Sequence, residues 1–228
     1  MLLFIILLAF ISIAVALAWF LISNDRGEKE PATALWLAVS FGLGGGLLAS
    51  WLEDHLVPLG NLLPGLPYET LLITGLAIAA IEEGCKFIPL ALFIYKKPYF
   101  NEHTDGIIYF ALAGLGLGLP ENIIYTLQLG TEAGVVRLLM TPLFQAATTG
   151  VIGYFLVRGK LAKRSPLAAC LPLAAMIILH GIYDFGLLSN SIGFAAVSLL
   201  ITVSMNITLI ALFFHARQLD RKLGLSAT

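Results

Sequence analysis

Three charged side chains lie close together inside an otherwise apolar stretch of the sequence. Residues 71–95 read LLITGLAIAAIEEGCKFIPLALFIY, and the charges belong to Glu82, Glu83 and Lys86. On a helix, Lys86 follows Glu82 by four positions and Glu83 by three, so one ammonium can pair with either carboxylate. A buried ion pair that fixes helix packing explains one glutamate and leaves the second without a partner. The doublet is therefore a candidate for general acid/base chemistry, which needs a carboxylate free to exchange a proton.

A second set of polar residues lies further along, again within apolar surroundings. His180 and Asp184, in LHGIYDF, are four positions apart and share a helix face, so the acid can orient the imidazole. The alternative for this pair is a structural hydrogen bond between helices. Glu121 and Asn122 follow a glycine-rich run, GLGLGLPEN, and Gln145 lies in TPLFQAATTG. For these three we expect a supporting role around the glutamates, and for Glu121 the alternative is a third catalytic carboxylate.

Composition indicates the environment in which these groups act. Hydrophobic residues make up 59% of the 228 residues and charged residues 12%, whereas a soluble domain has about a quarter of its residues charged. Apolar runs long enough to cross ~30 Å of hydrocarbon as helices recur along the chain. The sequence thus predicts an all-α, multi-pass protein of the cell membrane. The net charge of −1 gives no sign of a nucleic-acid partner, and the two cysteines, Cys85 and Cys170, lack disulfide or metal-ligand spacing.

Polar breaks divide the chain into about seven predicted spans without a linker long enough to separate domains. We therefore expect one membrane-embedded domain over 1–228, with its motif-bearing core at 70–188. The predicted spans are 2–23, 33–50, 70–95, 106–128, 138–157, 167–188 and 192–214.

The distribution of Lys and Arg predicts the orientation. Eleven basic residues fall in the loops after the first, third and fifth spans and in the C-terminal tail, and only Arg137 falls on the opposite side. Because cytoplasmic loops are enriched in Lys and Arg, the N-terminus is predicted outside and the C-terminus in the cytoplasm. The eleven are Arg26, Lys29, Lys96, Lys97, Arg158, Lys160, Lys163, Arg164, Arg217, Arg221 and Lys222.

With this orientation, the polar residues of the third to sixth spans converge between the membrane centre and its outer face. The same four spans each contain a proline, namely Pro89, Pro120, Pro142 or Pro172. An internal proline frees a backbone carbonyl one turn earlier, and in lipid such a group must be satisfied by protein or by a water-filled cavity. The coincidence favours a hydrated cavity at the centre of these four spans. Asp105, just before the fourth span, is predicted to be its N-cap.

The ordered set of motifs resembles the PrsW family of intramembrane proteases, distant relatives of the CAAX- and bacteriocin-processing membrane proteases. The resemblance rests on IEEGCKF, then FNEHTDGIIYFALAGLGLGLPENIIYTL, then HGIYDF, and covers residues 81–188. It implies that Glu82 and Glu83 are the essential carboxylates and that His180 supports the reaction. It implies that Glu121, Asn122 and Asp184 line the site. It also implies cleavage of membrane-anchored regulatory proteins, such as anti-sigma factors, near the outer face.

One position departs from the family pattern. Members usually carry another histidine in the segment that here reads TPLFQAATTG, where we align Gln145. Glutamine can donate to an oxyanion but is a poor metal ligand, so no cofactor is expected and a zinc ion remains the alternative.

The sequence therefore predicts an intramembrane endopeptidase acting on single-span substrates within the lipid bilayer. Its catalytic residues are Glu82, Glu83 and His180, and Lys86 and Gln145 are among the supporting residues. A proton-coupled transporter, which also places carboxylates at mid-membrane, and a non-catalytic scaffold are the alternatives. The substrate, the scissile bond and the oligomeric state are not predicted.

Overall fold

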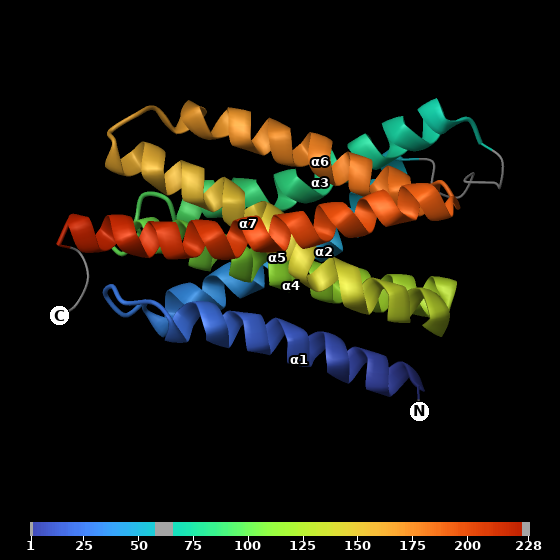
Figure 1. Ribbon diagram of the computed structural model, residues 1–228, viewed down its shortest axis with the longest axis horizontal. Helices are drawn as coiled ribbons and strands as arrows, with labels where there is room; N and C mark the ends of the chain where they lie inside the picture. Colours follow the sequence, from blue (N-terminus) through green and yellow to red (C-terminus); the bar gives the residue numbers. More distant parts are fainter. Residues whose placement is uncertain (1, 58–65, 225–228) are drawn as a thin grey trace.

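The computed structural model describes residues 2–57 and 66–224, and within these ranges every regular element is a helix (Figure 1). This confirms the predicted all-α class. The helices are α1 (Leu2–Ser23), α2 (Ala32–Leu56), α3 (Tyr68–Phe93), α4 (His103–Leu129), α5 (Thr131–Leu161), the short 3₁₀ helix η2 (Pro166–Ala169), α6 (Cys170–Leu188) and α7 (Ile192–Lys222).

Six of the described helices are long and apolar enough to cross a membrane, so the protein is a multi-pass membrane protein. The remaining one is α3, whose interior holds Glu82, Glu83 and Lys86. With 26 residues, α3 is ~39 Å long at 1.5 Å per residue, which exceeds the hydrocarbon thickness. Its length thus fits the third predicted span, 70–95, and only its charges set it apart from the other six long helices.

The connections between helices gather at two opposite ends of the bundle. Figure 1 shows the N-terminus at one end, and at the other end the end of α7 with the connections α1–α2, α3–α4 and α5–α6. The eleven basic residues counted above belong to this second end. That this end faces the cytoplasm remains a prediction from the charge distribution.

Two helices, α4 and α5, form the centre of the bundle. In the apolar window of each candidate span, 78% of the α4 residues and 89% of the α5 residues are buried. In the other described candidate spans the buried share is 17–28%. Glycines allow this close packing: Gly106 of α4 lies against the Gly153 backbone of α5, and Gly114 lies against the Gln145 backbone. Gly116, on another face of α4, contacts Val39 of α2 in the same way. Small residues at such positions let helix backbones approach in lipid, and here they hold α4 between α5 and α2.

The start of α4 is fixed by three acidic side chains. Glu102 is the N-cap and Asp105 completes a capping box, because Asp105 Oδ2 accepts from the Glu102 N–H at 2.6 Å. The prediction that Asp105 is itself the N-cap was therefore wrong, since the helix begins at His103. From the far end of the chain, Asp220 accepts hydrogen bonds from the backbone N–H groups of His103 and Thr104 and from both side chains, at 2.7–3.1 Å. This contact, the Asp220 clasp, joins the end of α7 to the start of α4.

The prolines fall differently from the prediction at one of four positions. Pro89, Pro120 and Pro142 lie inside α3, α4 and α5 as expected. The predicted span over 167–188 is present, but it begins as the 3₁₀ helix η2 and continues as α6, so Pro172 lies in the first turn of α6. In a first turn the missing N–H would have no intrahelical partner in any case. Three helices, not four, are therefore interrupted.

Candidate active site

The doublet of α3 points into the bundle, with Glu83 and Lys86 fully buried and Glu82 2% exposed. Glu83 Oε1 is held by three donors: Lys86 Nζ at 2.7 Å, His180 Nδ1 at 2.9 Å and Thr148 Oγ1 at 3.0 Å. These donors come from α3, α6 and α5. Glu83 is thereby the point at which three helices are joined by charge-assisted hydrogen bonds, which are the strong ones.

Glu82 has a different environment from its neighbour. Its Oε2 accepts one hydrogen bond, from Gln145 Nε2 at 2.6 Å, and lies 3.6 Å from His180 Nε2. Successive side chains on a helix point ~100° apart, and here that angle turns Glu83 toward Lys86 and Thr148 and Glu82 toward Gln145. The two carboxylates therefore contact opposite nitrogens of one imidazole ring.

Gln145 of α5 connects the members of the site. Its Nε2 donates to Glu82 and also to Glu121 Oε2, at 2.9 Å, while its Oε1 accepts from Lys86 Nζ. The amide thus uses both ends, and it brings α3 and α4 together through α5. The predicted supporting residues Lys86, Glu121 and Gln145 are placed in one network.

Glu121 and Asn122 of α4 share a cation that the sequence analysis had assigned only to a loop. Arg137 of α5 forms an ion pair with Glu121, and its Nε donates to Asn122 Oδ1 at 3.1 Å. The guanidinium also lies over the Tyr125 ring, 4.1 Å from its centroid. Helix α5 begins seven residues before the predicted span, at Thr131, which is why Arg137 enters the bundle. The signal available in the sequence was that Arg137 is the one basic residue in the loops predicted to lie outside the cell.

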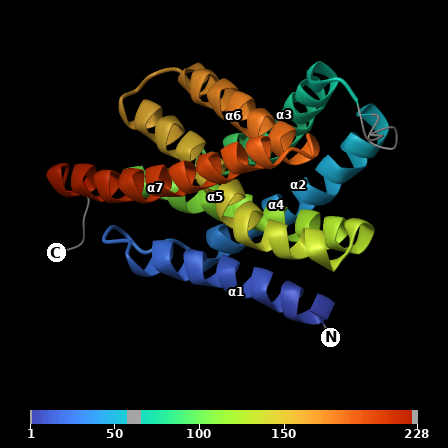
Figure 2. The same cartoon turned by 45° about the vertical axis from the view of Figure 1, so that its right-hand side comes forward.

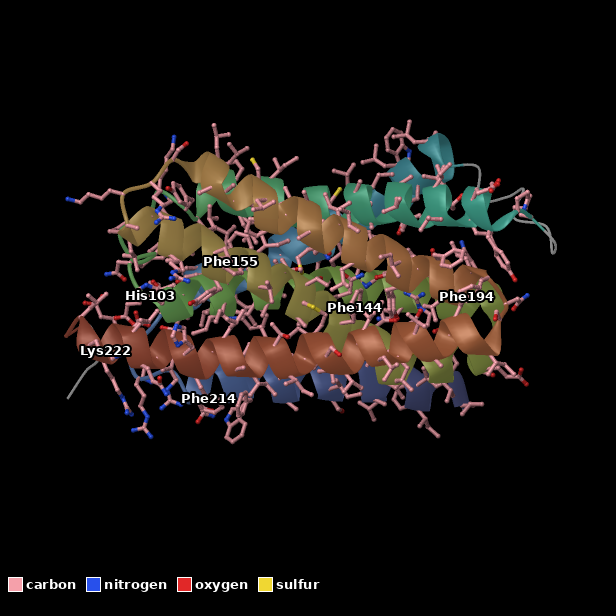
Figure 3. All side chains as sticks on the ribbon, turned by 45° about the horizontal axis from the view of Figure 1, so that its top comes forward. His103, Phe144, Phe155, Phe194, Phe214 and Lys222 are labelled. Carbon is pink, nitrogen blue, oxygen red and sulfur yellow. The ribbon has the colours of Figure 1, made fainter. Side chains whose placement is uncertain are left out.

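Packing of aromatic rings fixes His180 in place. Phe144 meets the imidazole edge-on, with ring centroids 5.0 Å apart, and stacks on Tyr183 at 4.0 Å. Figure 3 places Phe144 between the end of the bundle with His103 and Lys222 and the end with Phe194. The hydrogen bond that orients the ring comes from Glu83, whereas Asp184 Oδ2 lies 3.7 Å from Nε2, beyond hydrogen-bond distance. Asp184 lies beside the ring but does not orient it as the spacing had suggested.

A further carboxylate, Glu53, reaches this region from α2. The sequence predicts a break between spans after residue 50, but α2 continues to Leu56 and leaves Glu53 only 3% exposed. Gly46, two turns before Glu53 on α2, lies against Pro120, the residue before Glu121, so this part of α2 packs beside the site. The neighbouring Asp54 is exposed. The two side chains differ because they lie on different faces of α2, and the sequence alone could not assign which face is turned inward.

Three buried carboxylate oxygens of this region receive no hydrogen bond from the described residues. They are Glu53 Oε1, Glu83 Oε2 and Asp184 Oδ2. A buried acceptor without a donor is unfavourable by about 1–3 kcal/mol, so each is a position for a water molecule or a substrate N–H. The arrangement can therefore hold polar groups in an otherwise apolar bundle.

Comparison with known proteins decides the family. Residues 30–214 match the family described as "PrsW family intramembrane metalloprotease", which is most of the chain. The chain belongs to the PrsW family. The PrsW resemblance of residues 81–188 is thus confirmed and extended to nearly all helices.

Curated PrsW relatives match over different lengths. The chain is 29% identical to "Protease PrsW" of Oceanobacillus iheyensis over 206 residues, covering 87% of this chain and 90% of the relative. It is 30% identical to that of Clostridioides difficile over 193 residues, covering 78% and 77%. With the Bacillus subtilis protein the match is 31% over 115 residues and spans about half of each chain (50% and 53%). No solved structure matches the chain.

The PrsW family name implies a metal, and the residues of the site can be tested against it. The described residues contain no group of three or more His, Cys, Asp or Glu side chains placed to hold an ion. The ammonium of Lys86 already lies between Glu83 and Gln145, where its positive charge opposes the binding of a metal cation. Gln145 is also a weak ligand for zinc, which takes His, Cys, Asp or Glu. The arrangement does not fit a resident metal, so no step below is assigned to one.

Proposed function

We propose that this PrsW protein is an intramembrane endopeptidase that hydrolyses membrane-anchored protein substrates near the outer face, with a water activated by Glu82. By family resemblance, anti-sigma factors belong to the substrate class. The observation that carries the proposal is the contrast between the two glutamates around one imidazole.

Glu83 is unsuited to proton transfer because its Oε1 already accepts from Lys86, His180 and Thr148. Taking up a proton there would oppose three donors, one of them an ammonium. Glu82 Oε2 accepts only from the neutral amide of Gln145 and faces His180 Nε2 at 3.6 Å. A general base needs this kind of freedom together with reach to the water. We therefore assign Glu82 as the base and Glu83 as the positioning residue for His180.

The reaction then follows from the neighbours of Glu82. Glu82 removes a proton from water, the oxygen attacks the peptide carbonyl carbon, and the carbonyl oxygen takes the negative charge. His180 Nε2, in the protonated ring, donates to this oxyanion. Gln145 Nε2 joins it by exchanging its hydrogen bond to Glu82, which now holds a proton, for one to the oxyanion. Such donors contribute several kcal/mol in a water-poor site. When the carbon–nitrogen bond breaks, the amine receives the proton held by Glu82. Water is consumed, and one carboxyl and one amino terminus form.

The test is a search for new N-termini in membrane proteins of cells that express the chain. We compare the unaltered chain with Glu82→Gln, Glu83→Gln and His180→Ala, each checked for insertion and thermal stability in detergent. Products should appear with the unaltered chain and be absent with Glu82→Gln. Full cleavage by a well-folded Glu82→Gln chain would falsify the assignment. Titration with a chelator addresses metal dependence separately.

A further inference from the structure

The described surface carries an apolar groove between α2 and α3, on the side of α3 away from Glu83 and Lys86. Its volume is ≈ 550 Å³ and its lining is almost wholly apolar. Helix α2 lies between α3 and α4 (Figure 2). Exposed side chains such as Leu92 line the groove, so it opens to the outside of the bundle. The rim consists of large side chains that remain about half exposed, among them Leu48 and Ile88 at 50% and 57%.

Small residues form the floor of this α2–α3 groove. A Cβ added at Gly44 or Gly84 would meet no atom within 4 Å, so the space above these glycines is open. A Cβ at Gly45 would instead lie 3.1 Å from the Cys85 carbonyl oxygen, so the two helices nearly touch there and close the floor. A floor of small residues between rims of Leu and Ile is the surface on which a further helix packs closely in lipid.

One end of the groove adjoins the candidate active site along α3. Its lining on α3 runs from Ala80 and Ile81 to Phe93, and the 13 helical rises from Ala80 to Phe93 correspond to ~20 Å. Ala80 and Ile81 directly precede Glu82, so one end of the groove lies at the level of the proposed base. From this level the groove extends toward the end of the bundle that carries the basic loops.

We propose that the α2–α3 groove holds the transmembrane helix of the substrate, with the bond to be cleaved presented to Glu82 at the groove's end near Leu52 and Ala80. This rests on the proposed function, because it names how the substrate of that same site is held. Glu82 is 2% exposed, so a substrate must approach along a surface adjoining it. The groove adjoins it, is long enough for more than half of a span, and is lined for an apolar helix.

A disulfide experiment tests the groove without requiring cleavage. The full chain carrying Glu82→Gln and Cys170→Ser retains Cys85 as its one cysteine. It is reconstituted in phosphatidylcholine vesicles with a designed single-span helix of leucine and alanine flanked by lysines, in which one cysteine is moved along the sequence. Because a disulfide needs Cα atoms within about 7 Å, oxidation with copper phenanthroline reports contact. We expect cross-links at positions three or four apart on one face of the designed helix.

Filling the groove provides the matched control. Gly44→Leu places a side chain into the open space, whereas Gly193→Leu makes the same change on α7, where an added Cβ meets only Ser191 Oγ at 3.8 Å. Gly44→Leu should lower cross-linking about tenfold, equivalent to about 1.4 kcal/mol, and Gly193→Leu should leave it unchanged. The proposal would be overturned by an absence of cross-links, by cross-links all around the helix, or by Gly44→Leu having no effect. An absence of any effect of Gly44→Leu would indicate that lipid occupies the groove.

The cleavage products separate this proposal from the proposed function. If the periodic cross-links form but the unaltered chain gives no products in cells, the peptidase assignment fails and the groove stands as a helix-binding surface. If products form equally with the unaltered and Gly44→Leu chains, the groove proposal fails and the peptidase assignment stands.

Discussion

Replacing Lys86 by methionine should strongly destabilise the bundle, because it leaves the buried Glu83 carboxylate without its cation. Both side chains are fully buried, and Lys86 Nζ donates to Glu83 at 2.7 Å and to Gln145. Removing one member of a buried ion pair costs about 3–5 kcal/mol. Glu83 keeps its hydrogen bonds from His180 and Thr148, so we expect a loss at the lower end, about 3 kcal/mol.

A double-mutant cycle makes this value specific to the pair. In Glu83→Gln/Lys86→Met the charge is removed together with its partner, so the double variant should recover about 2 kcal/mol relative to the sum of the single changes. The measurement is reversible unfolding in mixed micelles, followed by circular dichroism as the denaturing detergent is increased. Lys222→Met, at an exposed position, is the control and should change stability by less than about 0.5 kcal/mol. A loss below about 1 kcal/mol for Lys86→Met, or additive single changes, would refute the reasoning.

Three further predictions follow from the surroundings of the site. Burial raises the pKa of Glu102, just before α4, to about 7. Between about pH 4.5 and 7 the folded state therefore holds a proton that the unfolded state has released, and stability should fall as pH rises through this range. Glu102→Gln keeps an acceptor for the Glu28 N–H and should flatten that part of the melting-temperature profile, and an unaltered slope would contradict the assignment. Gln145→Leu removes the donor to Glu82 and should lower the cleavage rate at saturating substrate by about 10²-fold or more, with Thr208→Val on α7 as a control; near-normal cleavage by a stable variant would count against an oxyanion role. Gly114→Leu pushes α4 away from the Gln145 backbone and should reduce both melting temperature and cleavage, whereas Gly193→Leu should change neither.

Local pattern was sufficient for the helical class and for the set of residues that meet. Charged and amide side chains are costly in apolar spans, and this cost identified six residues that the structure brings into one network. They are Glu82, Glu83, Lys86, Glu121, Gln145 and His180. Spacing along one helix could not say which glutamate is held by which donors, since the donors come from α5 and α6. It also suggested Asp184 as the partner of His180, where a carboxylate from another helix makes the hydrogen bond.

The residues that were missed lie where a helix continues beyond its apolar run. WLEDH, residues 51–55, has the polarity of a loop, yet it is the last part of α2, with Glu53 turned inward and Asp54 outward. Arg137 was assigned to a loop for the same reason. Polarity marks where a span can leave hydrocarbon, but a helix ends only where its backbone hydrogen bonds end. Charged side chains in these extensions are then buried by neighbouring helices.

The Asp220 clasp has a consequence for how the bundle is completed during synthesis. The start of α4 leaves the ribosome more than a hundred residues before Asp220, and until Asp220 follows, four donors there lack its carboxylate. The start of α4 is therefore secured only once α7 is in place. Chains truncated before α7 should unfold more readily, because these donors lose the Asp220 carboxylate.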